Sequence, residues 1–425
     1  MDNPNYIPRI IDKTLETYLE TFGAVNIVGA KWCGKSWTGA KHAASAYYVA
    51  DPAGNYNNRT LARMDPSAVL PGARPRLIDE WKEVPPIWDA VRFEVDKSPE
   101  KGKYILTGSA TPNRKGVMHS GAGRIASLRM RPMSLYESGR SSGSVSLRDL
   151  CSGKLETIVT GQPTLDELID AVIRGGWPGN QDCSLEKAAL IPKEYIKTVL
   201  DSDINEIDET YRDITKVSSL MKSLARNEST TASLRTLQSD MAAYDRTDVT
   251  TITIASYIDA LSRLFLVENQ KPFSSSLRSK VRVRQQEKRH FTDPSLACAL
   301  LEADRDSLMG DLETLGFLFE ALCVRDLRIY AESFGGSLYH YQDYSNREID
   351  AVVSLPGGEW CAFEIKLGTN RIDEAAANLL KIQKEIETEN SEKKAKILCV
   401  ISGLSNAAYV RPDGVFVVPI TALRP

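Results

Sequence analysis

The apolar and polar positions of the first 130 residues form short runs. Runs typical of strands cover 24–28, 76–80 and 103–109, and each ends in glycine or in polar or charged residues. Short apolar runs bounded in this way are typical of strands buried on both faces of a parallel sheet. We therefore expect an α/β fold, a doubly wound parallel sheet with its polar strand ends at one edge.

The middle of the chain has the spacing of helices. Five apolar residues share one face of a helix that Gly175 and Gly176 terminate: Leu165, Leu168, Ile169, Val172 and Ile173. Further helices are expected over 187–207, 214–226, 233–243 and 252–265, and strands over 266–271 and 280–285. The last three helices and the two strands predict a winged helix-turn-helix. Residues 141–164, rich in serine and glycine, predict an interdomain crossing or a mobile loop.

The last 120 residues return to strands. An apolar helix is expected near 316–324, and strands follow over 347–354, 359–366, 396–401 and 414–419. These patterns predict three domains, an α/β domain over 1–145, a helical and winged-helix domain over 160–300, and a second α/β domain over 305–425.

Composition narrows the class of protein only slightly. The chain has 425 residues, a formal net charge of −3 and seven cysteines without CxxC spacing. The cysteines predict reduced thiols, and the balanced charge means that any nucleic-acid surface is local. The sequence has no run of about 18 apolar residues and no basic-then-apolar leader. We expect a cytoplasmic protein with no membrane partner.

A glycine-rich loop follows the first apolar run: Gly29-Ala30-Lys31-Trp32-Cys33-Gly34-Lys35-Ser36. It has the form GxxxxGK[ST] of a phosphate-binding loop, in which the glycines let successive N–H groups converge on phosphate oxygens. Lys35 is then expected to reach the β- and γ-phosphates of ATP, and the Ser36 hydroxyl to ligate Mg²⁺. A structural glycine turn is the alternative.

Polar residues end the next two runs. Asp79 is expected to hold Mg²⁺ through water and Glu80 to polarise the attacking water, whereas a surface acidic turn is the alternative. Thr107 or Ser109 is placed to sense the γ-phosphate, although a plain strand end accounts for them nearly as well. Arg124, beside a glycine turn, is the candidate arginine finger, and a salt bridge to a local carboxylate is an equal alternative.

The motifs GAKWCGKS, LIDEWKEVP, YILTGSA and GRIASLRMRPMSLYE, in this order, resemble a large prokaryotic family of AAA-type (AAA+) ATPases. Its members carry a winged-helix region and a C-terminal nuclease-like domain. GGWPG at 175–179 and YIKTVLDSDI at 195–204 are similar to its middle-domain signatures. The resemblance implies ATP and Mg²⁺ at Lys35 and Ser36, an acidic pair at Asp79 and Glu80, and Arg124 in the finger region. It also implies a homo-oligomer, a ring or another assembly.

Cations gather in the expected wing, where Glu287 is the single acid: Lys271, Arg278, Lys280, Arg282, Arg284, Lys288 and Arg289. Alternation places 278–284 on one face of a strand, where the cations would follow a DNA or RNA backbone without reading its sequence. An edge strand kept soluble by charge is the alternative.

Four residues of the last domain have the order E…D…ExK of PD-(D/E)XK nucleases: Glu320, Asp350, Glu364 and Lys366. Asp350 and Glu364 are expected to share one Mg²⁺, with Glu320 completing the metal shell or orienting a ligand. Alternation puts Lys366 beside Glu364, where it would position or activate water. A buried ion network of Asp350, Glu364 and Lys366 without metal is the alternative.

Two functions remain open from the sequence. The first is an ATP-hydrolysing protein that acts on DNA in remodelling, branched-DNA processing, repair or defence, with a C-terminal domain that binds or cleaves DNA. The second is a nucleotide-dependent oligomeric switch that binds a protein partner and has a catalytically inactive nuclease fold.

Overall fold

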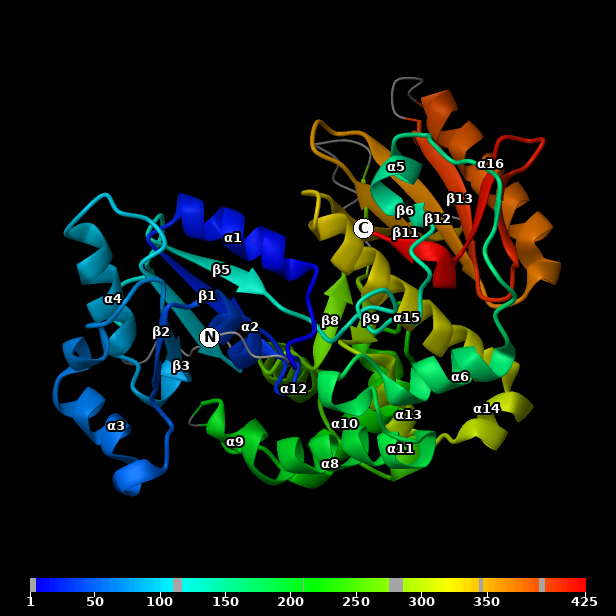
Figure 1. The fold of residues 1–425 in the computed structure, drawn as a ribbon. Helices are drawn as coiled ribbons and strands as arrows, with labels where there is room; N and C mark the ends of the chain where they lie inside the picture. Colours follow the sequence, from blue (N-terminus) through cyan, green and yellow to red (C-terminus); the bar gives the residue numbers. More distant parts are fainter. Residues whose placement is uncertain (1–4, 110–116, 209, 275–285, 344–346, 390–393) are drawn as a thin grey trace. The chain divides into compact units, whose positions relative to one another are not determined.

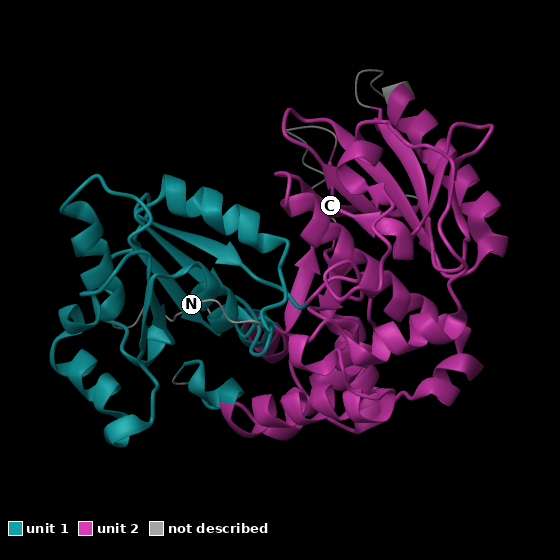
Figure 2. Ribbon diagram, viewed as in Figure 1, with its two compact units in different colours: residues 1–132, 203–211, 260–265 teal, residues 133–202, 212–259, 266–425 magenta. Residues whose placement is uncertain are grey.

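The computed structural model describes residues 5–109, 117–208, 210–274, 286–343, 347–389 and 394–425 (Figure 1). The chain divides into two compact units (Figure 2). Unit 1 comprises residues 1–132, 203–211 and 260–265, and unit 2 comprises 133–202, 212–259 and 266–425. None of the helices in the described part of the chain is long and apolar enough to cross a bilayer.

Unit 1 is built on a five-stranded parallel sheet in the order β2-β3-β4-β1-β5. Its strands are β1 (Ala24–Val28), β2 (Ser45–Tyr48), β3 (Arg76–Asp79), β4 (Tyr104–Gly108) and β5 (Ile125–Arg129). β1 lies between β4 and β5, with Ala24 opposite both Tyr104 and Ile125. Because all five strands run parallel, their carboxyl ends meet at one edge, as the α/β prediction requires.

Two apolar cores cover the faces of this sheet. Helices α1 (Ile11–Thr21) and α2 (Lys35–His42) contribute to the core that contains Leu15, Val25 and Ile105. Helix α4 (Ile87–Asp96) contributes to the other core, which contains Trp81 and Tyr104. Helix α3 (Ala53–Met64) follows β2 along the chain.

Helices fill the first part of unit 2. They include α6 (Leu165–Arg174), α8 (Leu190–Thr198), α10 (Ile214–Arg226), α11 (Leu234–Asp245) and α12 (Thr251–Arg263), the last of which ends in unit 1. α10, α11 and α12 agree with the predicted helices. The strand predicted at 280–285 lies outside the described residues, and β8 (Val267–Gln270) instead pairs antiparallel with β9 (Lys288–Phe291). The winged-helix assignment itself stays a prediction.

The rest of unit 2 contains a seven-stranded sheet in the order β10-β11-β12-β13-β15-β14-β7. These strands are β10 (Ser337–Gln342), β11 (Glu348–Ser354), β12 (Trp360–Lys366), β13 (Ile397–Ser402), β14 (Ala407–Val410), β15 (Phe416–Pro419) and β7 (Ile158–Val159). Helix α16 (Ile372–Glu389) buries Leu379 and Ile382 in one core with β-strand residues such as Val400. Helix α15 (Leu312–Glu332) precedes the sheet and carries Glu320.

The segment 141–164 is not the crossing or mobile loop that its composition predicts. Within it β6 (Val145–Ser146) pairs parallel with β16 (Leu423–Arg424), and β7 pairs with β14. The Ser141 hydroxyl donates to the carbonyl of Leu423 at 2.6 Å. Its serines therefore satisfy backbone groups of the last strand, and the segment is part of the C-terminal sheet region.

Candidate functional site

The glycine-rich loop lies between β1 and α2, at the carboxyl edge of the unit 1 sheet. Gly29 has φ +156° and Gly34, which precedes α2, has φ +107°. A Cβ added at Gly29 would lie 2.1 Å from the Met130 carbonyl oxygen, so no other residue fits without moving that backbone. The close approach of loop and strand end therefore explains why glycine is needed at Gly29.

Lys35 is folded over this loop. Its side chain is buried, with the residue 5% exposed, and Nζ donates to the Ala30 carbonyl at 2.7 Å. Ser36 lies in the first turn of α2, where backbone N–H groups have no helical partner and favour an anion. Lys31 pairs with Asp203 at 2.6 Å. The predicted loop residues are thus brought together around one helix start.

The back of the loop is held by Arg9, which the sequence reading missed. Its buried guanidinium donates to the Cys33 carbonyl at 2.7 Å and to the Arg131 carbonyl at 2.8 Å. A single arginine ahead of the first helix has no periodic or motif signal that would single it out. It fixes the loop against the segment that follows β5.

The acidic pair and Thr107 form one hydrogen-bonded group. Thr107 Oγ1 donates to Asp79 Oδ1 at 2.5 Å and accepts from the Glu80 N–H at 3.2 Å. Burial raises the pKa of the Glu80 carboxyl, and Asp79 adds to the rise, while Lys35 opposes it. A carboxylate with a raised pKa is a better general base near neutral pH. Thr107 holds both acids in place, and its role as a γ-phosphate sensor stays a prediction.

Arg124 lies at the opposite edge of the sheet from the loop. Its carbonyl accepts from the N–H of Ala24 at the start of β1, whereas Gly29 follows the end of that strand. A strand of this length separates the two edges by roughly 15 Å. The guanidinium pairs with Asp96 at 2.8 Å, which is the local salt bridge named as the alternative. Arg124 therefore does not serve its own chain's loop, and a finger role requires a neighbouring copy.

The four predicted nuclease residues also come together, but around lysines. Lys288 Nζ, from β9, lies 2.7 Å from Glu320 Oε1 and 3.8 Å from Asp350 Oδ1. It also lies 2.5 Å from Glu348 Oε1. Lys366 Nζ lies 2.7 Å from Glu364 Oε2 and 3.3 Å from Asp350 Oδ2. We call these six side chains the carboxylate–lysine cluster.

Two lysines lie among four carboxylates in this cluster. Burial raises the pKa of Glu320 and of Glu364, each to about 8, whereas Lys366 and Lys288 overcome burial and hold the pKa of Asp350 down. Among the residues that the structure describes, no group of three acidic, histidine or cysteine side chains is arranged to hold a metal ion. Because the Lys288 ammonium lies among the carboxylates that would be ligands, the cluster does not fit Mg²⁺ in this arrangement. Lys366 pairs with Glu364 and Asp350 as the ion-network alternative describes, and the metal site stays a prediction.

The predicted DNA-binding cations divide into two groups. Arg278, Lys280, Arg282 and Arg284 lie outside the described residues. Lys288 is 2% exposed, and the Arg289 guanidinium donates to the Ala232 carbonyl. The expectation that Lys288 faces DNA is wrong, because β9 turns this lysine toward Glu320. Arg289 is likewise engaged within unit 2.

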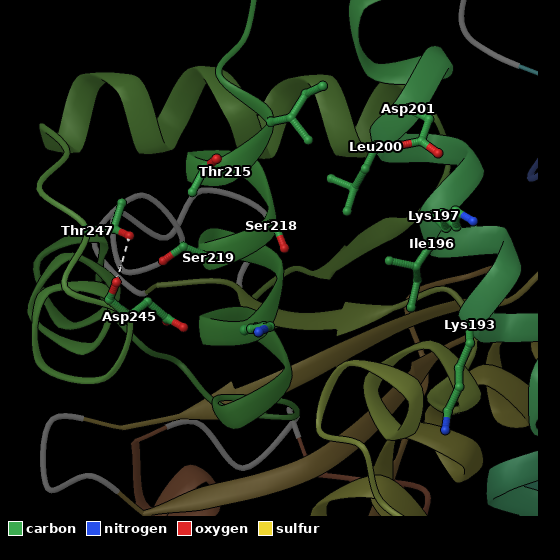
Figure 3. Close-up of a pocket in the computed structure, with 12 residues that line it drawn as sticks. Lys193, Ile196, Lys197, Leu200, Asp201, Thr215, Ser218, Ser219, Asp245 and Thr247 are labelled. Atoms are coloured by element: carbon green, nitrogen blue, oxygen red, sulfur yellow. Dashed lines mark hydrogen bonds between the residues drawn. The ribbon is translucent and has the colours of Figure 1, made fainter.

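A cavity of about 520 Å³ lies in unit 2 between α8 and α10 (Figure 3). Lys193, Lys197 and Lys222 line it together with hydroxyl groups that include Ser218. None of the predicted site residues lines this cavity. The nucleotide and nuclease predictions therefore do not bear on it.

Three family models match successive parts of the chain. An AAA domain matches residues 21–139, and two domains of unknown function, DUF8612 and DUF4143, match residues 165–307 and 315–423. The uncharacterized proteins Rv2008c of Mycobacterium tuberculosis and Mb2031c of Mycobacterium bovis are each 24% identical over 305 residues. The match covers 71% of this chain and 61% of each relative, so it spans less than two thirds of their length.

Two solved structures are similar at low identity. The Walker-type ATPase PABY2304 of Pyrococcus abyssi has a TM-score of 0.41 at 12% identity, covering 68% of this chain and 94% of that one. The ORC1 protein of Aeropyrum pernix, solved in complex with DNA, has a TM-score of 0.26 at 12% identity, covering 73% and 96%. The AAA domain match and the loop geometry together support an AAA-type ATPase domain in this chain.

Proposed function

We propose that this protein binds ATP with Mg²⁺ at the loop Gly29–Ser36 and hydrolyses it. The observation that carries the proposal is the loop itself, whose Gly29 lies too close to the Met130 carbonyl for any side chain and whose Lys35 is buried beside it. The match of residues 21–139 to an AAA domain supports the same conclusion.

The residues present fit a magnesium–nucleotide complex. Loop N–H groups and Lys35 would hold the phosphates, and Ser36 and Asp79 would hold Mg²⁺, directly and through water. When bound, Mg²⁺ neutralises charge that develops on the β- and γ-phosphate oxygens. Glu80 accepts a proton from the attacking water, and Thr107 keeps Glu80 and Asp79 in register through its two hydrogen bonds.

An assay of phosphate release tests this proposal. The wild-type chain is expected to release phosphate from ATP only when Mg²⁺ is present, and Glu80→Gln to bind ATP but release little phosphate. Equal rates for the two proteins would refute the role of Glu80. Running the assay with duplex, single-stranded and branched DNA shows in addition whether one form stimulates turnover.

We also propose that DNA is the partner of unit 2 and that the chain acts as a homo-oligomer. The cation-rich sequence 278–284 between β8 and β9 supports DNA, and the match of residues 21–139 to an AAA domain is the basis for proposing an assembly. Neutralising Arg282 and Arg284 is expected to weaken DNA binding and reduce its salt dependence. If the affinity for DNA and its salt dependence are unchanged, the protein-binding switch is favoured instead. Light scattering in the presence of ATP measures whether the chain forms a homo-oligomer.

A specific observation favours a C-terminal domain that does not cut DNA. The Lys288 ammonium, which is not part of the E…D…ExK order, lies among the carboxylates on which a metal-dependent nuclease would rely. A cut that requires Mg²⁺ and is lost in Asp350→Asn would overturn this view. We therefore propose an ATP-driven protein whose nuclease-like domain binds without cleaving.

A further inference from the structure

Lys82 is a charged residue of unit 1 whose ammonium is buried. Nζ is shielded from solvent and has no hydrogen-bond acceptor among the residues that the structure describes. Burying an unpaired ammonium costs free energy, so we expect an anion to pair with it when the site is occupied. The neighbouring lysines do have acceptors, since Lys35 donates to Ala30 and Lys31 pairs with Asp203.

The position of Lys82 is fixed by the two residues that precede it. Glu80 precedes it at the end of β3 in a left-handed conformation, φ +51° and ψ +45°. Trp81 is fully buried and donates its indole N–H to Asn26 Oδ1, on β1, at 3.2 Å. Lys82 is therefore held at the carboxyl edge of the sheet, beside the end of β3.

The Lys82 stem then passes over the end of β4. A Cβ added at Gly108 would lie 2.7 Å from Lys82 Cε and 3.3 Å from Nζ, so the glycine leaves room for the ammonium there. Gly108 pairs in register with Val28, the residue immediately before the phosphate-binding loop. The side chain thus reaches across the strand ends toward the place where the loop begins.

The charges around Lys82 describe a site for an anion. Burial lowers the pKa of its ammonium to about 7, Glu80 opposes the change, and Lys35 and Arg263 add to it. Of these groups, Arg263 already pairs with Asp208 at 2.7 Å, and the Glu80 carboxyl is assigned to the attacking water. The γ-phosphate of a triphosphate would give the Lys82 ammonium an anionic partner of its own.

We propose that Lys82 is a phosphate-binding residue of the nucleotide site and that its ammonium pairs with the γ-phosphate of ATP. The assignment rests on the proposed ATPase function and deepens it. The γ-phosphate follows from the chain itself, because Lys82 lies two residues after Glu80, which is assigned to the water that attacks this phosphate. ADP lacks that group, so Lys82 would distinguish the two nucleotides.

Calorimetry of nucleotide binding tests the assignment. Lys82→Met keeps the apolar stem and removes the charge, and Lys101→Met, an exposed lysine of the same unit, is the matched control. Lys82→Met is expected to weaken binding of the β,γ-imido analogue of ATP at least tenfold and to change ADP binding less than twofold. Lys101→Met is expected to change neither. Lys82→Gln serves as a second variant if the methionine chain does not fold.

Proton uptake by Lys82 during nucleotide binding gives a second measurement. A purely structural role of Lys82 would not produce it. At pH 8 the free ammonium is largely neutral, so analogue binding to the wild type should take up nearly one proton, seen as a dependence of the heat on buffer ionisation. That uptake should be lost in Lys82→Met. An unchanged preference for triphosphate over diphosphate in the variant would overturn the assignment, and so would equal losses for both nucleotides. Absence of binding to the wild type would instead refute the ATPase proposal.

Discussion

The edge of the unit 1 sheet and the carboxylate–lysine cluster of unit 2 use the same residue types in opposite ways. At the unit 1 edge Lys82 has no acceptor among the described residues, and Lys35 donates only to a loop carbonyl. In the cluster Lys288 and Lys366 each contact at least two carboxylates. A buried lysine without an acceptor favours an anionic ligand, whereas lysines that already pair with carboxylates do not need one. The comparison is the basis for proposing chemistry at the unit 1 edge and a structural role for the cluster.

The largest expected effect is on ATP turnover at the unit 1 edge. Glu80→Gln should lower ATP turnover by roughly 10²- to 10⁴-fold, because a neutral amide cannot accept the proton of the attacking water. Steady-state phosphate release measures the effect. Glu83→Gln, a nearby and more exposed acid that pairs with Arg59, is the control and should keep its rate. A comparable loss in both variants would show that the effect is not specific to Glu80.

If the carboxylate–lysine cluster has a structural role, removing one of its lysines should destabilise the fold. Lys288→Met should lower the free energy of unfolding by about 3 to 5 kcal/mol, since it leaves buried carboxylates without their cation. Urea denaturation measures the change. Lys396→Met removes an exposed pair with Glu359 in the same unit and should leave the free energy of unfolding nearly unchanged. If the two variants lose the same amount, the cluster is not the self-contained network described above.

The effect of Mg²⁺ on thermal stability also tests whether the carboxylate–lysine cluster can hold a metal ion. Without nucleotide, Mg²⁺ should not stabilise the wild-type cluster, because Lys288 lies among the ligands that the ion needs. In Lys288→Met the same carboxylates lose their cation, so millimolar Mg²⁺ should raise the unfolding temperature. Thermal denaturation with Mg²⁺ or with EDTA measures both. Stabilisation of the wild type that disappears in Asp350→Asn would restore the predicted metal site.

The smallest effect is a dependence of stability on pH. Burial raises the pKa of Glu364 to about 8, above its ordinary value of 4.5, so the folded chain binds this proton more tightly than the unfolded chain. Its contribution to stability is present below pH 4.5 and is lost as the pH rises toward 8, on the order of 1 to 3 kcal/mol. Glu364→Gln should flatten the decline in urea titrations at pH 5 to 8. An equal slope in the variant would assign the dependence to other groups.

Local patterns were sufficient for the elements and the loop. The strands at 24–28, 76–79 and 104–108 and the helices α10, α11 and α12 follow from apolar spacing, and the motif at 29–36 identified the loop. Pairing between distant segments was not predictable. The serine- and glycine-rich stretch at 141–164 joins strands near the C-terminus because of partners that its own sequence does not reveal.

The sequence also did not predict in which direction individual side chains point. Along a strand, Lys288 and its neighbours point to alternate faces, but which face is buried depends on Glu320, which lies on helix α15. Lys82 was overlooked for a similar reason. An isolated lysine after an acidic pair is ordinary in sequence, and only its burial and its path over Gly108 make it unusual.

Calorimetric titration of the wild-type chain with ATP and Mg²⁺, beside Lys35→Ala, tests the central claim most directly. The account predicts one nucleotide bound per chain and a loss of binding in Lys35→Ala, with both proteins folded by circular dichroism. A folded wild type that gives no heat at millimolar ATP, or a variant that binds as tightly as the wild type, would contradict it.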